Sequence, residues 1–170
     1  MKKNLLLIGF ILCFSLTTCR KKQEAVLPPE TTIGAMSFGC KINGKVFVPK
    51  DGRGKPGLYV QYVYLDGGWY LNIPALDWQD RHIEGVSITT DSLLVSENEI
   101  YPIGTTKGGF RAFYSKEKDY RKLDNDVGEV TIKKFDPVNR ILSGTFFFTG
   151  THESTGEKVE VTEGRFDVRF

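Results

Sequence analysis

Apolar and β-branched residues recur in short runs from residue 36 to the end of the chain, and each run has the length of a strand rather than a helix. Asn43-Gly44 separates the first two runs and supplies the two positive-φ residues of a tight hairpin turn. Asp66-Gly67-Gly68 separates the next two runs in the same way. The expected strands cover residues 37–42, 45–49, 58–65, 69–76, 83–90, 99–103, 110–114, 127–135, 141–150 and 158–170.

The final run shows the clearest period of two. Apolar residues at Phe166, Val168 and Phe170 alternate with charged residues from Arg165 to Arg169. This alternation is typical of a half-buried antiparallel strand. The charged run at 115–122 has no apolar stripe, so it is expected to be a solvated loop. Together the runs predict an all-β domain, an antiparallel β-sandwich or flattened barrel of about nine to eleven strands with little helix.

The first residues have a different pattern, with a basic start at Lys2 and Lys3 followed by an apolar run from Leu5 to Leu16. Twelve apolar residues are too few to span a bilayer, which needs roughly 20, so the pattern indicates an export signal. Prolines at 28 and 29 indicate an extended linker before the first strand. The predicted organisation is a signal peptide at 1–18, a lipidated cysteine and flexible tether at 19–35, and one β domain at 36–170.

Leu16-Thr17-Thr18-Cys19 resembles the lipobox of bacterial lipoproteins. The resemblance implies that a diacylglycerol is attached to the Cys19 thiol, that the chain is cut before Cys19, and that the new amine is acylated. Several acyl chains hold a protein stably at a membrane, whereas one binds only marginally. An ordinary secretory signal with an unmodified cysteine is the alternative.

The charges along the chain bear on its cellular location and on its partner. Lys2 and Lys3 supply the whole excess of +2, so the chain from Cys19 onward is balanced, and its charge suggests no nucleic-acid partner. In lipoproteins of the resembled type, a non-acidic residue after the cysteine implies the outer membrane. Arg20-Lys21-Lys22 lacks the acidic cluster of surface-exposed Bacteroidetes lipoproteins, which favours the periplasmic leaflet.

Three further stretches resemble small Bacteroidetes lipoproteins of unknown function. They are Phe38-Gly39-Cys40-Lys41-Ile42-Asn43-Gly44-Lys45-Val46-Phe47-Val48-Pro49 and the pair Ile141-Leu142-Ser143-Gly144-Thr145-Phe146-Phe147-Phe148 with Thr162-Glu163-Gly164-Arg165-Phe166-Asp167-Val168. The resemblance implies a lipoprotein address and an antiparallel β domain. It brings no catalytic residues.

Catalytic and metal-binding patterns are sparse. His82 and His152 are the only imidazoles, and they lack the spacing of a zinc site, so no metal and no cofactor is expected. His82 is expected at a surface or rim. Cys40 lies in a predicted strand and is expected to be a buried, inert thiol rather than a nucleophile.

Aromatic residues give the one hint of binding, because tyrosines and both tryptophans gather between residues 59 and 101. Their flat faces and polar edges suit a sugar ring or a protein partner. The alternative is that they fill the core as cross-strand pairs. The candidate ligand-binding residues are Tyr62, Trp69, Tyr70 and Trp78.

These features favour a non-enzymatic binding module on the envelope side of a membrane, anchored through Cys19, with a protein or a glycan as its ligand. One alternative is an envelope hydrolase of glycans, for which Asp77, Asp80 and Glu84 are the carboxylates to test. Another alternative is a structural subunit of an outer-membrane complex.

Overall fold

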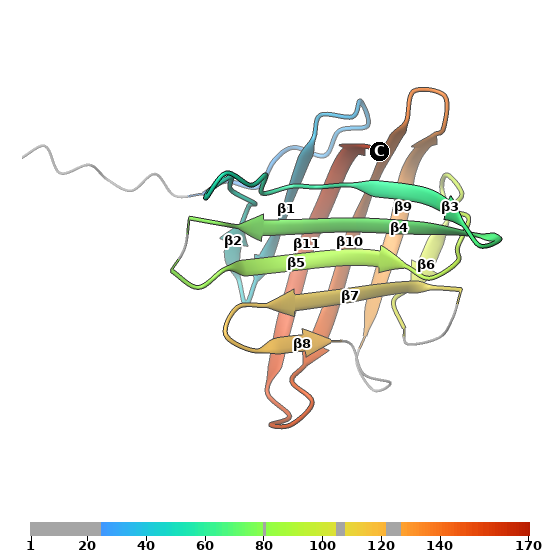
Figure 1. The fold of residues 1–170 in the computed structure, drawn as a ribbon. Coiled ribbons are helices and arrows are strands. Elements are labelled where there is room, and N and C mark those ends of the chain that lie inside the picture. Colours follow the sequence, from blue (N-terminus) through green and yellow to red (C-terminus); the bar gives the residue numbers. More distant parts are fainter. Residues whose placement is uncertain (1–24, 80, 105–107, 122–126) are drawn as a thin grey trace, which may run out of the picture.

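The computed structural model describes residues 25–79, 81–104, 108–121 and 127–170. Within these ranges the protein is all-β, with eleven strands and no helix (Figure 1). The strands are β1 Ser37–Ile42, β2 Lys45–Phe47, β3 Gln61–Leu65, β4 Gly68–Asp77, β5 Glu84–Thr90, β6 Ile100–Pro102, β7 Phe110–Ser115, β8 Asp119–Arg121, β9 Gly128–Asp136, β10 Ile141–Thr151 and β11 Lys158–Arg169.

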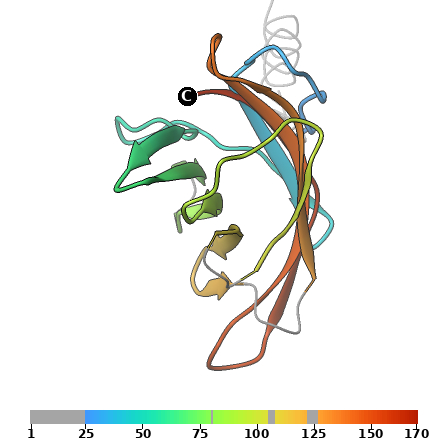
Figure 2. The same cartoon turned by 90° about the vertical axis from the view of Figure 1, so that its right-hand side faces the viewer.

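The strands form two antiparallel layers that face each other. One layer has the order β3-β4-β5-β7-β8, and the other has β2-β1-β11-β10-β9 with β6 beside β9. Figure 1 shows the first layer crossing in front of the second, and Figure 2 shows the two layers edge-on. Among the described strands of the two layers, β8 and β10 pair through Thr151 and Arg121, and an isolated bridge joins Ile103, next to β6, to Phe110 on β7. The result is a sandwich that is not closed into a barrel.

Side chains of the two inner faces fill the space between the layers. Ile73 on β4 and Ile88 on β5 are fully buried from one layer, as are Leu142 and Val168 from the other. Burying each such side chain contributes roughly 1.5–3 kcal/mol. The alternation expected on the final strand is therefore confirmed at Phe166 and Val168, which face the core.

Each predicted run overlaps an observed strand, and both predicted turns are present. Asn43 and Gly44 have φ of 47° and 78°, and Asp66 and Gly67 have φ of 48° and 84°. The loop predicted at 115–122 is wrong in part, because β8 forms there and pairs with β7. The physical reason is that one aromatic residue in this charged run, Tyr120, is buried and packs on the Tyr114 ring at a centroid distance of 5.5 Å.

The charged face of β11 holds the segment that precedes β1. Asp167 is only 1% exposed, although it lies on the charged face of the strand. Its carboxylate accepts hydrogen bonds from Thr31 Oγ1 at 2.6 Å and from the backbone N–H groups of Ile33, Gly34 and Ala35 at 3.0, 2.7 and 3.2 Å. Burial alone would raise the pKa of this carboxyl, but these four hydrogen bonds outweigh burial and lower the pKa below the usual 3.8.

Two arginines on the same face of β11 extend this attachment. Arg169 donates from Nη2 to the Ile33 carbonyl at 2.9 Å, and Arg165 donates from Nη1 to the Pro28 carbonyl at 3.4 Å. We call residues 28–35 the N-terminal strap. The part of the predicted tether that forms the strap is fixed to the domain, since its backbone supplies partners that the charged face of β11 needs. Cys19 and residues 1–18 lie outside the described residues.

Replacing Asp167 with Asn is expected to lower the free energy of unfolding by about 1–3 kcal/mol, because charged hydrogen bonds to the strap are lost. The lowered pKa means that this contribution is present above the usual carboxyl pKa and is lost as pH falls from about 5 towards 2. Urea unfolding at pH 7 and pH 3, followed by tryptophan fluorescence, measures both effects. Asp66→Asn, in an exposed turn, is the control, and an equal loss in both variants would contradict the assignment.

Candidate binding surface

Five aromatic residues meet where β3 lies over the ends of β9 and β11. The Tyr62 and Trp69 rings stack at 4.9 Å, and the Tyr64 ring tilts against Trp69 at 5.4 Å. Phe135 and Phe170 contact Tyr62 edge-on at 5.7 and 5.2 Å. We call these five residues the aromatic cluster. It joins the two layers through side chains, on the side away from the β8–β10 pair.

Tyr62 is the fixed centre of the aromatic cluster. Its side chain is buried, and its hydroxyl oxygen accepts a hydrogen bond from the Val95 N–H at 3.2 Å. The hydroxyl itself lies 3.5 Å from the Leu93 carbonyl, to which it donates. Burial raises the pKa of Tyr62, so the hydroxyl stays neutral and able to donate. Tyr62 therefore belongs to the core, and it supports the rings that lie further out.

The outer members of the aromatic cluster reach the surface. Tyr64 is 61% exposed, Trp69 is partly buried, and Val63 and Leu65 on the same strand are 45% and 58% exposed. Tyr64 and Trp69 thus form an aromatic surface on one face of the β3–β4 hairpin, and Val63 and Leu65 lie on its other face. This arrangement suits binding of another molecule by aromatic and aliphatic contact.

The four candidate residues do not form one site. Tyr62 and Trp69 lie together, whereas Tyr70 lies on the opposite face of β4, next to Val63 in the register. Trp78 follows the far end of β4, about 30 Å along the strand from Trp69. The strand therefore separates the two tryptophans.

The Trp78 side chain contacts the loop between β2 and β3 instead. Its Nε1–H donates to the Pro56 carbonyl at 2.9 Å, and the Lys55 ammonium lies 4.6 Å from the ring centroid. One face of the ring is thus covered by a cation, and its polar edge already has a partner. These two contacts indicate that Trp78 stabilises the loop rather than binding a ligand.

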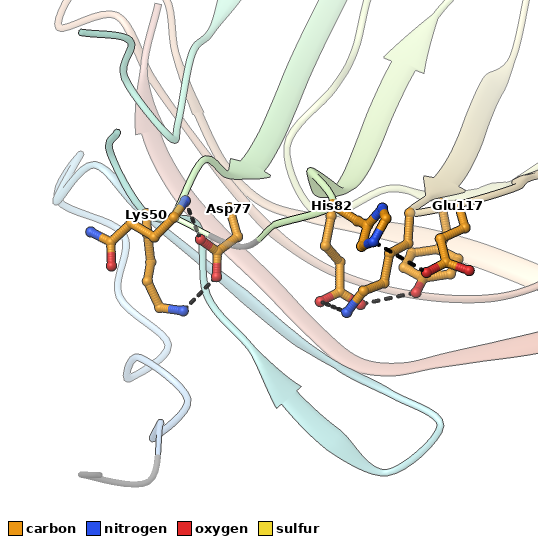
Figure 3. Close-up of polar contacts among 8 residues, drawn as sticks. Lys50, Asp77, His82 and Glu117 are labelled. Carbon is orange, nitrogen blue, oxygen red and sulfur yellow. Dashed lines mark hydrogen bonds and ion pairs between the residues drawn. The ribbon is translucent and has the colours of Figure 1, made fainter. Parts of the chain in front are cut away.

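The carboxylates considered for hydrolysis lie at this same end of β4. Asp77 and Glu84 face each other in the β4–β5 register, and Figure 3 shows Asp77 directed at Lys50. Asp77 also accepts the Gln79 backbone N–H at 2.9 Å. Asp80, the third carboxylate, lies outside the described residues.

Glu84 is held from two sides. Its Oε1 accepts the Tyr114 hydroxyl at 2.9 Å, and its Oε2 lies 3.3 Å from the Lys116 ammonium. Burial and this hydrogen bond raise the pKa of Tyr114. His82 lies nearby, half-exposed, with Nε2 3.7 Å from a Glu117 oxygen (Figure 3), which agrees with the expected rim position. Each oxygen of Glu84 thus has a partner within the protein.

Cys40 is fully buried on the inner face of β1, as expected. Burial, together with the charge of Glu84, raises the pKa of its thiol to about 12, so the reactive thiolate is scarce near neutral pH. In the described part of the chain, no three His, Cys, Asp or Glu residues are grouped so that they could hold a metal ion. The same described residues form no helix that is long and apolar enough to cross a membrane.

Sequence reasoning found Tyr62 and Trp69 but left Tyr64, Phe135 and Phe170 out of the candidate site. For Tyr64 a signal existed, because a two-residue turn at Asp66-Gly67 places Tyr64 opposite Trp69 on one face. Phe135 and Phe170 come from distant strands of the other layer. Only the packing of the two layers brings them to Tyr62.

Comparison with known families gives one result. A family model described as "Domain of unknown function (DUF6252)" matches residues 70–168, more than half of the chain, from β4 into β11. No curated protein and no solved structure matches the chain. The match agrees with the expectation of a family without an assigned function, and it does not include β3.

Cys40 is expected to resist alkylation by iodoacetamide at pH 8 in the folded protein and to react fully in denaturant, because its thiol is buried and its pKa is raised. Mass spectrometry of a Cys19→Ser chain that begins at residue 19 measures the modification, since Cys40 is then the only thiol. Rapid labelling of the native chain would show instead that the thiol is accessible and reactive.

Proposed function

The chain belongs to the DUF6252 family, whose function is unknown, and we propose that it is a non-catalytic module that binds a protein partner at a membrane of the cell envelope. The observation that carries the proposal is the exposed Tyr64 ring beside Trp69, which stacks on the buried Tyr62 ring. An aromatic anchor held by a rigid neighbour loses little side-chain entropy on binding.

A protein partner fits this surface better than a glycan does. The apolar residues lie along a strand at the edge of a layer, which offers an open face rather than a cleft. Four cavities of 280–390 Å³ lie elsewhere on the described surface, and none of these four is lined by Trp69 or Trp78. Small ligands favour concave sites with converging polar groups, whereas aromatic residues on open surfaces are typical anchors at protein interfaces.

The alternative of a hydrolase finds less support in the geometry. Asp77 is engaged by Lys50 and the Gln79 N–H, and Glu84 by Tyr114 and Lys116. A general acid or nucleophile needs an oxygen directed at a substrate, and these oxygens are directed at the protein's own donors. We therefore assign these carboxylates a structural role at the rim of the sandwich.

The proposed anchor is a lipid on Cys19, and it is placed near the domain by the N-terminal strap. Pro28, where the strap begins, is nine positions after Cys19, so the domain can stand at most about 30 Å from the lipid. The periplasmic leaflet of the outer membrane is the proposed address, because Arg20 follows the cysteine. A lipid-anchored module at this distance meets its partner close to the membrane surface.

Cys19→Ser is expected to move the protein from the membrane fraction to the soluble fraction, because the acyl chains are lost with the thiol. Fractionation followed by immunoblotting measures the shift, and incorporation of labelled palmitate is expected to disappear at the same time. Cys40→Ala is the control, since that thiol is buried in the domain and should leave membrane attachment unchanged. Membrane retention of Cys19→Ser would contradict lipid anchoring.

Tyr64→Ala is expected to reduce crosslinking of the full chain to its envelope partner at least several-fold, because the exposed ring is lost while Tyr62 and the core remain. Crosslinking in intact cells, followed by mass spectrometry, measures the loss. Phe113→Ala on β7 is the matched control, with an exposed aromatic side chain outside the aromatic cluster.

Two outcomes would contradict the choice of a protein partner. In one, equal crosslinking in Tyr64→Ala and Phe113→Ala would show that the aromatic cluster is not the binding surface. In the other, a purified envelope polysaccharide would shift the tryptophan fluorescence, and Trp69→Phe would abolish the shift, which would favour a glycan.

A further inference from the structure

The outer face of the layer formed by β3, β4, β5, β7 and β8, which we call the front layer, carries a hollow. Figure 2 shows no described segment over this face, whereas the N-terminal strap lies against the outer face of the other layer, with Pro28 packed on Gly39. The hollow has a volume of about 390 Å³ and spans β4, β5, β7 and β8. We call it the outer hollow. Six of its lining residues carry its chemistry: Asn72, Ser87, Thr89, Phe113, Ser115 and Asp119.

Small side chains form the centre of the outer hollow, and an aromatic ring stands beside them. Ile88 on β5 is fully buried, so its neighbours Ser87 and Thr89 point outward. Ser87 lies between Pro74 of β4 and Phe113 of β7 in the register. The Phe113 side chain is 38% exposed. A ligand that enters the hollow therefore meets hydroxyl groups and the face of a ring together.

The polar side chains of the outer hollow have hydrogen-bonding capacity to spare. Within the described chain, the side chains of Asn72, Ser87 and Thr89 make no hydrogen bond, and the same holds for Ser115 and Asp119. Hydroxyl and amide groups both donate and accept, and a carboxylate accepts. Among the described lining residues, Asp119 alone is charged at neutral pH. The hollow thus offers a mainly neutral set of donors and acceptors.

A second exposed ring stands on the other side of Ser87. Tyr59 is 47% exposed and donates its backbone N–H to the Pro74 carbonyl at 3.2 Å, so it lies beside β4. Its two chain neighbours pack against the core, so Tyr59 points outward. In the register Pro74 is followed by Ser87 and then by Phe113. Three strand spacings therefore separate the Cα atoms of Tyr59 and Phe113, about 14 Å.

We propose that the outer hollow binds an uncharged, extended glycan. A sugar ring has an apolar face, which stacks on an aromatic ring, and an edge of hydroxyls, which donate and accept hydrogen bonds. Phe113 and Tyr59 supply two stacking faces, and Ser87 lies between them. A chain of linked sugars presents the same two features in each unit, so it can use both rings and the polar floor together.

Other classes of ligand fit the outer hollow less well. A protein partner is usually held at an apolar centre, whereas the centre here is the hydroxyl of Ser87. An anionic ligand meets the Asp119 carboxylate, and Arg111, which lies beside Thr89 in the register, is already paired with Asp91 at 2.8 Å. A compact small molecule would stay largely exposed on an open sheet face.

This inference does not rest on the proposed function. Tyr64 and Trp69 lie on the inward-facing side of the β3–β4 hairpin with Tyr62, whereas the outer hollow lies on the outward-facing side of the same layer. A protein partner at Tyr64 and a glycan at Phe113 therefore contact opposite faces of the front layer and do not compete.

Isothermal titration calorimetry of the full chain, solubilised in a detergent without a sugar head group, tests the site. The probes are the neutral hexasaccharides cellohexaose, xylohexaose and maltohexaose, and at least one is expected to bind with a Kd below about 1 mM. Phe113→Ala is expected to weaken this binding about ten-fold, because a stacking face is lost. Phe147→Ala is the matched control, since Phe147 is 41% exposed on the outer face of the other layer.

Two further variants test the polar floor. Thr89→Val removes a hydroxyl but keeps the shape of the side chain, and it is expected to weaken binding about three- to ten-fold. Thr149→Val on β10, which is also partly buried, is its control. Ser87→Leu fills the centre of the hollow and is expected to abolish binding. Circular dichroism checks the fold, and these side chains are not fully buried, so the core stays intact.

Three results would overturn the proposal: no binding of any of the three hexasaccharides at about 10 mM, equal affinity in Phe113→Ala and Phe147→Ala, or tighter binding of the acidic hexagalacturonate than of every neutral probe. The second result would place the glycan elsewhere on the protein, and the third would indicate an anionic ligand. Absence of saccharide binding with retained, Tyr64-dependent partner crosslinking would refute the glycan site alone. The reverse result would refute only the proposed function.

Discussion

The two layers of this domain are held together mainly by side-chain packing, because few backbone pairs join them within the described residues, among them Thr151 with Arg121 and Ile103 with Phe110. Each layer is hydrogen-bonded mostly within itself, so what it gains from the other layer is chiefly the burial of its inner face. Ile73 and Ile88 on one side and Leu142 on the other are fully buried for this reason. The position of the aromatic cluster follows from how that inner face ends.

On the side away from the β8–β10 pair, the inner face ends in aromatic rings. Tyr62 reaches across to Phe135 and Phe170, and its own outer neighbours are Trp69 and Tyr64. The same contacts that close the core therefore leave the last ring exposed. A surface built in this way is rigid, which suits binding, and it lies beside an edge strand, which suits association.

Several buried or half-buried carboxylates of the domain bind other segments of the chain. Asp167 accepts hydrogen bonds from the N-terminal strap. Asp77 and Glu84, at the turn end of the β4–β5 hairpin, pair with Lys50 and Lys116. These carboxylates resemble catalytic candidates in the sequence, yet each is engaged by a donor from the same chain. The strap has a further effect, because it fixes the point at which a lipid-bearing N-terminus would leave the domain.

The sequence by itself determined all the observed strands except β8, together with the two tight turns and the inward face of β11, because period-two alternation and turn chemistry are local properties. It also identified Cys40 as a core residue. Only the tertiary structure decided which aromatic residues meet, that Tyr70 and Trp78 lie apart from Trp69, and that Asp167 is buried under the strap. These features depend on contacts between residues far apart in the chain, and local patterns carry no information on such contacts.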